Sequence, residues 1–143
     1  MMVWVHALLG AALGKLCRNS PQALLVGALS HMGADMLPHR DLDLPTEAAL
    51  AAGTLGLVAA AAGPRSREFA GAVGATLPDL ENLVGRALRL PDERLLLPTH
   101  RCCHGREVRS LLPQVALALA CAAVLLLPGL ACCAPDRERG ISS

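Results

Sequence analysis

The sequence contains very few aromatic residues. Its 143 residues include one tryptophan (Trp4), one phenylalanine (Phe69) and no tyrosine. The apolar residues are instead mostly alanine, leucine and valine. Strands favour aromatic and β-branched side chains, whereas alanine and leucine are among the best helix formers. The scarcity of aromatic residues therefore argues against a β-sheet and predicts an all-α fold.

The chain also has no marked excess of charge of either sign. The formal net charge is +1, and the arginines are scattered without stacking aromatic residues beside them. Nucleic-acid-binding domains usually carry a basic stripe, so no nucleic-acid partner is predicted. No glycine-rich phosphate-binding loop is present either.

The cysteines lack the C-x-x-C spacing of a zinc ribbon, a thioredoxin motif or a haem attachment site. There are six cysteines, of which two pairs are adjacent, Cys102-Cys103 and Cys132-Cys133. Disulfide geometry does not favour bonds between neighbouring residues. We therefore expect reduced cysteines that pack as small apolar side chains. Residues 1–14 contain no lysine or arginine, so a secretory signal peptide is not predicted.

Apolar residues make up 53% of the chain, and the mean hydropathy is +0.44. We expect one helical domain over residues 1–135, embedded in or associated with a membrane, with lipids as partners. The inner membrane of a cell is the expected location, through a multi-pass or a peripheral arrangement. The polar residues 136–143 are expected to form a disordered tail.

Prolines, glycines and charges divide the chain into a compact bundle of about five or six helices. Ser20 and Thr46 are the expected N-caps of the second and third helices, and Pro78 is expected to end the fourth. Ser110–Leu130 is the first candidate to enter or span a bilayer, and Ala48–Ala62 is the second. The predicted helices are Val3–Leu16, Gln22–Leu37, Ala48–Ala62, Glu68–Leu77, Asp79–Leu90 and a last one within Ser110–Leu130.

Ionisable residues inside apolar helices are costly and often mark a functional site. His31 and Asp35 are four residues apart, so both project from one face of a helix. Imidazole and carboxylate are suitable ligands for a divalent metal ion such as zinc. The structural alternative is a hydrogen bond at the helix end, in which Asp35 only orients His31.

Three further groups offer comparable chemistry. His100 and His104 have the same spacing of four, although an exposed polar turn would also explain them. Asp79 and Glu81 follow Pro78, where acidic residues also complement the dipole of a new helix. His6 is alone in the first apolar segment, where a histidine is more often a hydrogen-bonded structural residue than a ligand. We predict that His6, His31, Asp35, Asp79, His100 and His104 converge on one metal ion.

These motifs together resemble a family of small inner-membrane proteins classed as metal-dependent hydrolases. The resemblance runs from the first apolar helix with His6, through Ser-His-x-x-x-Asp-x-x-Pro-His and Gly-x-x-x-Pro-Asp, to Thr-His-Arg-x-x-His. It implies a mainly helical fold and a metal-assisted hydrolysis near the membrane. The same six residues would occupy the polar motif positions of the family.

Two functions remain open at this point. The first is a membrane-bound, metal-dependent hydrolase of a phosphoester or lipid-like substrate. In it a divalent ion, with zinc expected, would activate water, and Asp79 or Glu81 would act as the general base. The second is a non-catalytic integral membrane protein whose histidine–aspartate pairs hold helices together or bind metal structurally. Closed coordination by four protein ligands would favour the second function.

Overall fold

The computed structural model describes residues 2–40, 42–89, 91 and 110–128, with the backbone alone for 82–87. These residues form five α-helices and no β-strand, which confirms the predicted all-α bundle for this part of the chain. The predicted tail, 136–143, lies outside the described residues. The helices are α1 (Val3–Leu16), α2 (Ser20–Asp35), α3 (Leu44–Ala62), α4 (Arg67–Ala87) and α6 (Leu112–Leu126).

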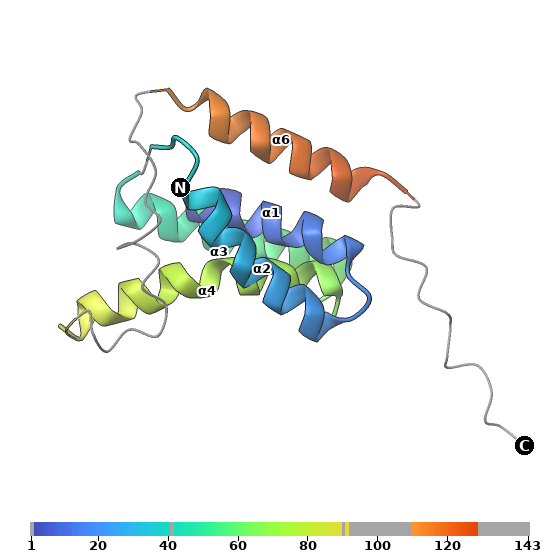
Figure 1. Ribbon diagram of the computed structural model, residues 1–143, viewed down its shortest axis with the longest axis horizontal. Coiled ribbons are helices and arrows are strands. Elements are labelled where there is room, and N and C mark those ends of the chain that lie inside the picture. The colour runs from blue at the N-terminus through green and yellow to red at the C-terminus, as the bar shows by residue number, and fades with distance from the viewer. Residues whose placement is uncertain (1, 41, 90, 92–109, 129–143) are drawn as a thin grey trace, which may run out of the picture.

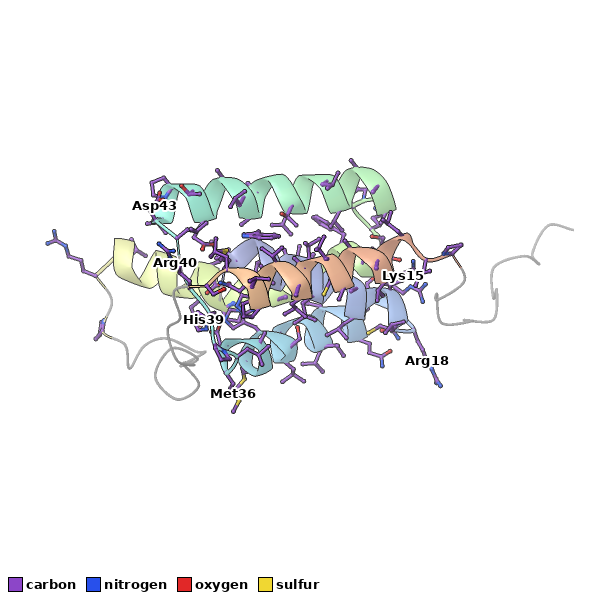
Figure 2. The ribbon with its side chains drawn as sticks, turned by 90° about the horizontal axis from the view of Figure 1, so that it is seen from above. Lys15, Arg18, Met36, His39, Arg40 and Asp43 are labelled. Atoms are coloured by element: carbon purple, nitrogen blue, oxygen red, sulfur yellow. The ribbon has the colours of Figure 1, made fainter. Side chains whose placement is uncertain are left out.

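Helix α1 lies at the centre of the bundle and packs against each of the other four described helices. In Figure 1 α6 and α4 lie on opposite sides of α1, and the perpendicular view in Figure 2 places α2 and α3 on its two remaining sides. The bounds of α1 agree with the predicted first helix. Its central position accounts for the burial of Val5, His6, Ala7, Gly10, Ala11, Ala12, Gly14 and Lys15.

Glycines allow α1 and α2 to approach α4 at backbone contact. A Cβ atom built on Gly10 or on Gly27 would clash with the backbone of Gly71, and one on Gly74 would clash with Leu24. Such small residues at helix contacts are typical of close packing in membranes. The contact at Gly71 lies one or two helical turns from the histidines and Asp79, so it fixes how near these side chains come.

The N-caps of α2 and α3 differ from the predicted ones. Asn19 caps α2 by accepting a hydrogen bond from the backbone N–H of Gln22, and Asp43 caps α3 in the same way from Thr46. The prediction of Ser20 and Thr46 as caps is therefore wrong. In both helices the proline occupies the second helical position rather than the first, which moves the cap towards the N-terminus.

Pro78 does not end a helix as predicted, because α4 continues through it as one helix. Proline has no N–H, so Pro78 cannot donate to the carbonyl of Gly74, and this loss normally destabilises a helix interior by about 3 kcal/mol. The glycine contacts with α1 and α2 fix the half of α4 before Pro78, and the side chain of Pro78 is itself fully buried. Tertiary packing therefore overrides the local preference at Pro78.

The interior of the described bundle is unusually polar. The largest fully buried side chains include three histidines, a glutamine and an aspartate, whereas many leucines lie on the outside. Soluble proteins show the opposite distribution. The polar members of that buried set are His6, His31, His39, Gln114 and Asp35.

Helix α3 is the one described helix that is long and apolar enough to cross a membrane. Its 18-residue window has a mean hydropathy of 1.4 and is only 11% buried within the bundle. Helix α6, the first candidate from sequence, has 15 residues and is shorter than a typical span. Pro113 in its first turn and Pro128 after its end limit its length, so the expected order of the two candidates is reversed.

Candidate metal centre

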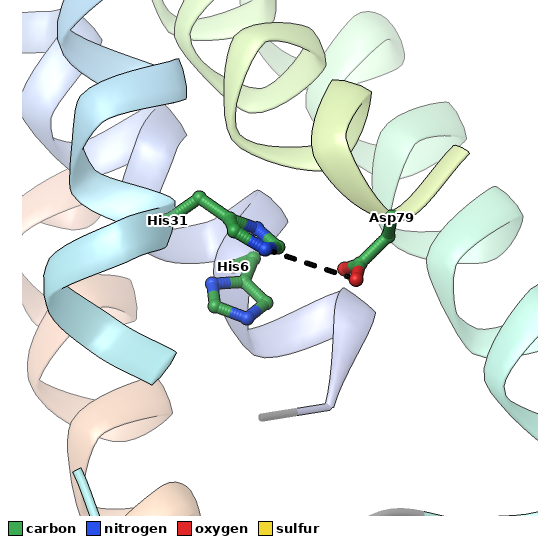
Figure 3. A group of neighbouring side chains, drawn as sticks. All are labelled: His6, His31 and Asp79. Atoms are coloured by element: carbon green, nitrogen blue, oxygen red, sulfur yellow. Dashed lines mark ion pairs between the residues drawn. The ribbon is translucent and has the colours of Figure 1, made fainter. Parts of the chain in front are cut away.

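His31, in the last turn of α2, has its ring orientation fixed by α4. Its Nδ1 donates a hydrogen bond of 2.9 Å to the carbonyl oxygen of Ala75, three residues before Pro78. Its Nε2 then faces two carboxylates, at 3.2 Å from Asp35 Oδ2 and 3.8 Å from Asp79 Oδ1. Figure 3 shows the imidazole of His31 pointing towards Asp79. The neutral ring would direct a lone pair at these oxygens, so the arrangement requires a cation or a proton at Nε2.

His6, on α1, contacts both His31 and Asp35 of α2. Its Nε2 lies 3.0 Å from Asp35 Oδ1. Its ring stacks on that of His31, with centroids 4.0 Å apart and an interplanar angle of 25°. Asp35 thus contacts both histidines, one with each carboxylate oxygen.

The charges of the site are strongly coupled. Burial opposes ionisation of Asp35, but the hydrogen bonds with His31 and His6 outweigh it and hold the pKa of Asp35 well below its usual range. Burial also opposes a charge on His31, yet Asp35 and Asp79 outweigh it and raise the pKa of His31. At His6 the burial effect prevails and lowers the pKa. The surroundings therefore favour one positive charge between two carboxylates.

The spacing of the donor atoms is compatible with a metal ion. His6, His31 and Asp79 each offer a ligand atom, and these atoms lie within 4.8 Å of one another. Two ligands of one zinc ion lie at most about 4.4 Å apart, because each is about 2.0–2.2 Å from the ion. Small side-chain rotations would therefore bring the three groups onto one ion.

Access to the site is uneven. The side chains of His6, His31 and Asp35 are 0–1% exposed, whereas that of Asp79 is 15% exposed. Solvent or a substrate group therefore reaches the site most easily beside Asp79.

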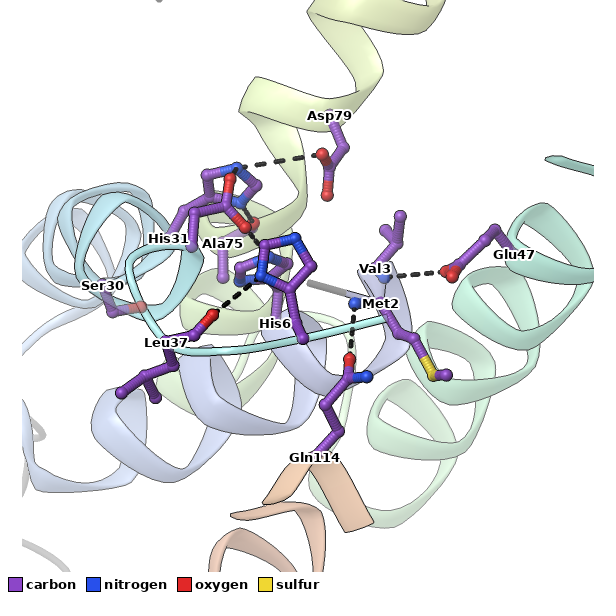
Figure 4. Close-up of polar contacts among 12 residues, drawn as sticks. Met2, Val3, His6, Ser30, His31, Leu37, Glu47, Ala75, Asp79 and Gln114 are labelled. Carbon is purple, nitrogen blue, oxygen red and sulfur yellow. Dashed lines mark hydrogen bonds and ion pairs between the residues drawn. The ribbon is translucent and has the colours of Figure 1, made fainter. Parts of the chain in front are cut away.

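Two buried polar side chains hold the N-terminus of α1, one turn before His6. Gln114 of α6 accepts a hydrogen bond from the backbone N–H of Met2, and Glu47 of α3 accepts one from that of Val3. Figure 4 shows both contacts beside the histidines. Gln114 also donates to the carbonyl of Arg40, and Glu47 accepts from the N–H of Leu42. The connector between α2 and α3 is thereby fastened to the same end of the bundle.

The predicted site residues are brought together as far as the structure describes them. His6, His31, Asp35 and Asp79 meet at one end of the bundle. His100 and His104 lie outside the described residues, so their part in the site stays a prediction. Glu81 is partly buried two residues beyond Asp79, and its role as a general base also stays a prediction.

Ala75 and Gln114 shape this end of the bundle but were not singled out from the sequence, whereas His39 belongs to the Ser-His-x-x-x-Asp-x-x-Pro-His motif. The carbonyl of Ala75 leaves no sequence pattern. Gln114 does, because it is a polar residue within an otherwise apolar helix. His39 is buried, and its Nδ1 donates to the carbonyl of Leu37, so it folds back against the helix end.

Searches with this chain against protein-family models, curated proteins and solved structures found no match. The chemistry of the site is accordingly inferred from its own residues.

Proposed function

We propose that this protein is a membrane-bound, metal-dependent hydrolase with a divalent ion, zinc being the best fit, between His6, His31, Asp35 and Asp79. The observation that supports this most is the position of His31. Its Nδ1 is committed to Ala75, and its Nε2 faces two carboxylates. A divalent cation at Nε2 would satisfy the imidazole and both carboxylates together.

The expected reaction is hydrolysis of a phosphoester or a lipid-like ester. A divalent ion in such a site polarises the substrate oxygen and makes water a better nucleophile at neutral pH. Asp79 lies at the accessible edge of the site, so either Asp79 or Glu81 would accept the proton from the attacking water. Arg40, in the connector beside the site, would hold an anionic group of the substrate.

Attachment to a membrane is supported by the apolar outer faces of α2, α3 and α6. Leu25, Leu57 and Leu119, one on each of these helices, are 61%, 67% and 66% exposed. Large contiguous apolar surfaces on a single chain mark contact with a membrane or another protein. Because these faces surround a polar interior, lipid is the partner that fits their extent best.

The hydrolase proposal is tested on the full chain purified in detergent. Hydrolysis of p-nitrophenyl phosphate, bis(p-nitrophenyl) phosphate, p-nitrophenyl butyrate and phospholipid vesicles is measured before and after chelation and with added zinc. We expect activity on at least one substrate, its loss on chelation, its return with zinc and its absence in Asp79→Ala. Activity that stays at the wild-type level after chelation, or in Asp79→Ala, would contradict a metal-dependent reaction at this site.

A non-catalytic metal site is the second candidate function. The near-complete burial of His6, His31 and Asp35 favours it, because structural sites are closed to solvent. It predicts bound metal with no hydrolysis of any of these substrates, and a fall in thermal stability on chelation.

A further inference from the structure

Gln114 is a fully buried polar side chain that supplies none of the ligand atoms of the metal centre. It lies in the first turn of α6 and is 1% exposed. The rest of α6 consists of leucine, alanine, valine, proline and cysteine. A buried amide in such an apolar helix is costly unless it is hydrogen-bonded, so its partners indicate what the side chain stabilises.

Both polar atoms of the Gln114 amide bind backbone groups from other parts of the chain. Its Oε1 accepts a hydrogen bond of 3.0 Å from the N–H of Met2, the N-cap residue of α1. Its Nε2 donates one of 2.9 Å to the carbonyl oxygen of Arg40, in the connector after α2. One side chain of α6 thus joins the start of α1 to the segment that follows the end of α2.

The two segments that Gln114 joins lead directly to His6 and Asp35. The carbonyl of Met2 accepts a hydrogen bond of 3.3 Å from the N–H of His6, one turn into α1. Asp35 is the last residue of α2, so the connector begins immediately after it. Figure 4 shows Gln114 reaching from α6 to Met2. The 3.0 Å contact between His6 Nε2 and Asp35 Oδ1 therefore joins two chain segments whose separation Gln114 fixes.

The glycine contacts hold the same helices at a different level of the bundle. Gly10 lies one turn after His6, Gly27 lies one turn before His31, and both face the backbone of Gly71. These contacts set the distance of α1 and α2 from α4. At the end of the bundle that holds the ligands, the start of α1 is instead fixed by polar contacts from α6 and α3.

We propose that Gln114 is a positioning residue of the metal centre, and that this side chain couples α6 to the ligands on α1 and α2. A metal site keeps its affinity only when the surrounding contacts hold its ligands close to the geometry that the ion requires. The proposal rests on the metal centre proposed above. It holds whichever ring nitrogen His6 offers to an ion, because Gln114 acts on the backbone that carries the ring.

A matched pair of substitutions separates positioning from the mere fastening of α6. Gln114→Met fills similar space and removes both hydrogen bonds. Lys15→Met is the control, because Lys15 binds backbone carbonyls at the opposite, C-terminal end of α6. Both variants leave buried backbone groups unpaired, so both should destabilise the bundle. Gln114→Glu retains an acceptor for the N–H of Met2 and serves as a milder variant.

The measurement is a titration of the detergent-purified full chain with Co²⁺, followed by visible absorption, beside chemical denaturation of each variant. Partners that touch a ligand directly change metal affinity by about 10–100-fold, and Gln114 acts one step further away, so we expect a loss of about three- to tenfold for Gln114→Met. Its absorption spectrum should also shift. Lys15→Met should stay within about twofold of the wild-type affinity, because distant sites act independently. Gln114→Glu should lie between the wild type and Gln114→Met.

Wild-type affinity in Gln114→Met, or an equal loss in Lys15→Met, would overturn the positioning role. Absence of Co²⁺ binding by the wild type would instead refute the metal centre itself. Nitrogen NMR of the metal-free protein tests the coupling without any ion. The imidazole signals of His6 and His31 should shift in Gln114→Met and stay unchanged in Lys15→Met, and unchanged signals in Gln114→Met would overturn the coupling.

Discussion

At the scale of single residues, the contact between His31 and Ala75 determines which ring nitrogen faces the carboxylates. Donation from Nδ1 to a backbone carbonyl holds both the tautomer and the ring angle. The backbone of α4 is closely packed at this point, because α1 and α2 contact it through glycines. The imidazole is thus oriented before any ion binds, which reduces the reorganisation that binding requires.

Asp79→Asn tests the carboxylate side of the centre. The substitution keeps the shape of the side chain and removes its charge, so we expect zinc affinity to fall by more than the roughly 10–100-fold typical of an outer partner. Isothermal titration calorimetry of the purified protein measures this. Asp43→Asn is the matched control, because Asp43 is an exposed N-cap and asparagine caps a helix equally well. Equal affinities of the two variants would contradict a ligand role for Asp79.

Part of the site was predictable from local sequence, because helical geometry links spacing to direction. The separation of four residues placed His31 and Asp35 on one face, and the two side chains do meet at 3.2 Å. That Asp79 and His6 would lie close to His31 and Asp35 was expected on one ground only, which is that each buried polar group needs a partner. The orientation of His31 was not predictable, because it depends on a carbonyl of a distant helix.

At the scale of elements, Lys15 fastens the C-terminal end of α6 to α1. Its Nζ donates to the carbonyls of Val124, Leu125 and Leu127 at 3.1, 2.7 and 2.8 Å. The last carbonyls of a helix lack partners within the helix, and a cation also complements the negative end of the helix dipole. Lys15 therefore satisfies three acceptors that an apolar interface would leave unpaired.

Lys15→Met should destabilise the bundle, because methionine fills similar space but cannot donate. Leaving buried acceptors unpaired costs about 1–3 kcal/mol, so we expect a clear fall in the free energy of unfolding. Chemical denaturation in detergent, followed by circular dichroism, measures it. Arg18→Met, at an exposed neighbouring position, should change the stability little. A loss of similar size in both variants would argue against the specific contact.

Glycine substitutions test the close contact between α1 and α4. A Cβ atom on Gly71 would clash with the backbone of Gly10, whereas one on Gly56 of α3 meets nothing within 4 Å. Gly71→Ala should therefore destabilise the bundle by about 1–3 kcal/mol through overpacking. Gly56→Ala should be neutral or stabilising by up to about 1 kcal/mol, because alanine favours helix. Thermal unfolding measures the stability of both variants. A Gly71→Ala variant more stable than Gly56→Ala would contradict the close contact between α1 and α4.

The elements themselves were predicted to different degrees. The bounds of α1 followed from an apolar segment that the charges of Lys15 and Arg18 bring to an end. The continuity of α4 through Pro78 did not, because local propensity favours a break there and long-range packing removes it. Pro21 and Pro45 marked the starts of α2 and α3 correctly to within a few residues, but not which polar side chain caps each helix.

At the scale of the whole molecule, the described residues combine a small apolar core with several large buried polar side chains and an outer surface rich in leucine. Histidines, a glutamine and an aspartate are among the largest fully buried side chains, and leucines of α2, α3 and α6 face outwards. The high content of apolar residues led us to expect an apolar outer surface. Which helix would be the longest apolar one was not predicted correctly, because it depends on where the prolines end α6.

Membrane attachment is tested by carbonate extraction of membranes from cells that express the chain. We expect the protein to remain in the pellet, because the exposed apolar faces are most stable in lipid. Leu57→Asp places a charge on the exposed side of α3 and should shift protein towards the supernatant, while Leu57→Met should not. Complete release of the wild-type protein would contradict membrane attachment.

The most direct test of the metal centre is the zinc content of the purified wild-type chain beside that of His31→Asn. Both proteins are loaded with zinc, freed of excess ion by gel filtration in detergent and measured by plasma mass spectrometry. X-ray absorption of the wild type then reports the ligand atoms. We expect about one zinc ion per chain, with nitrogen and oxygen ligands at about 2.0–2.2 Å, and strong depletion in His31→Asn. Equal trace amounts of zinc in the two proteins would contradict it.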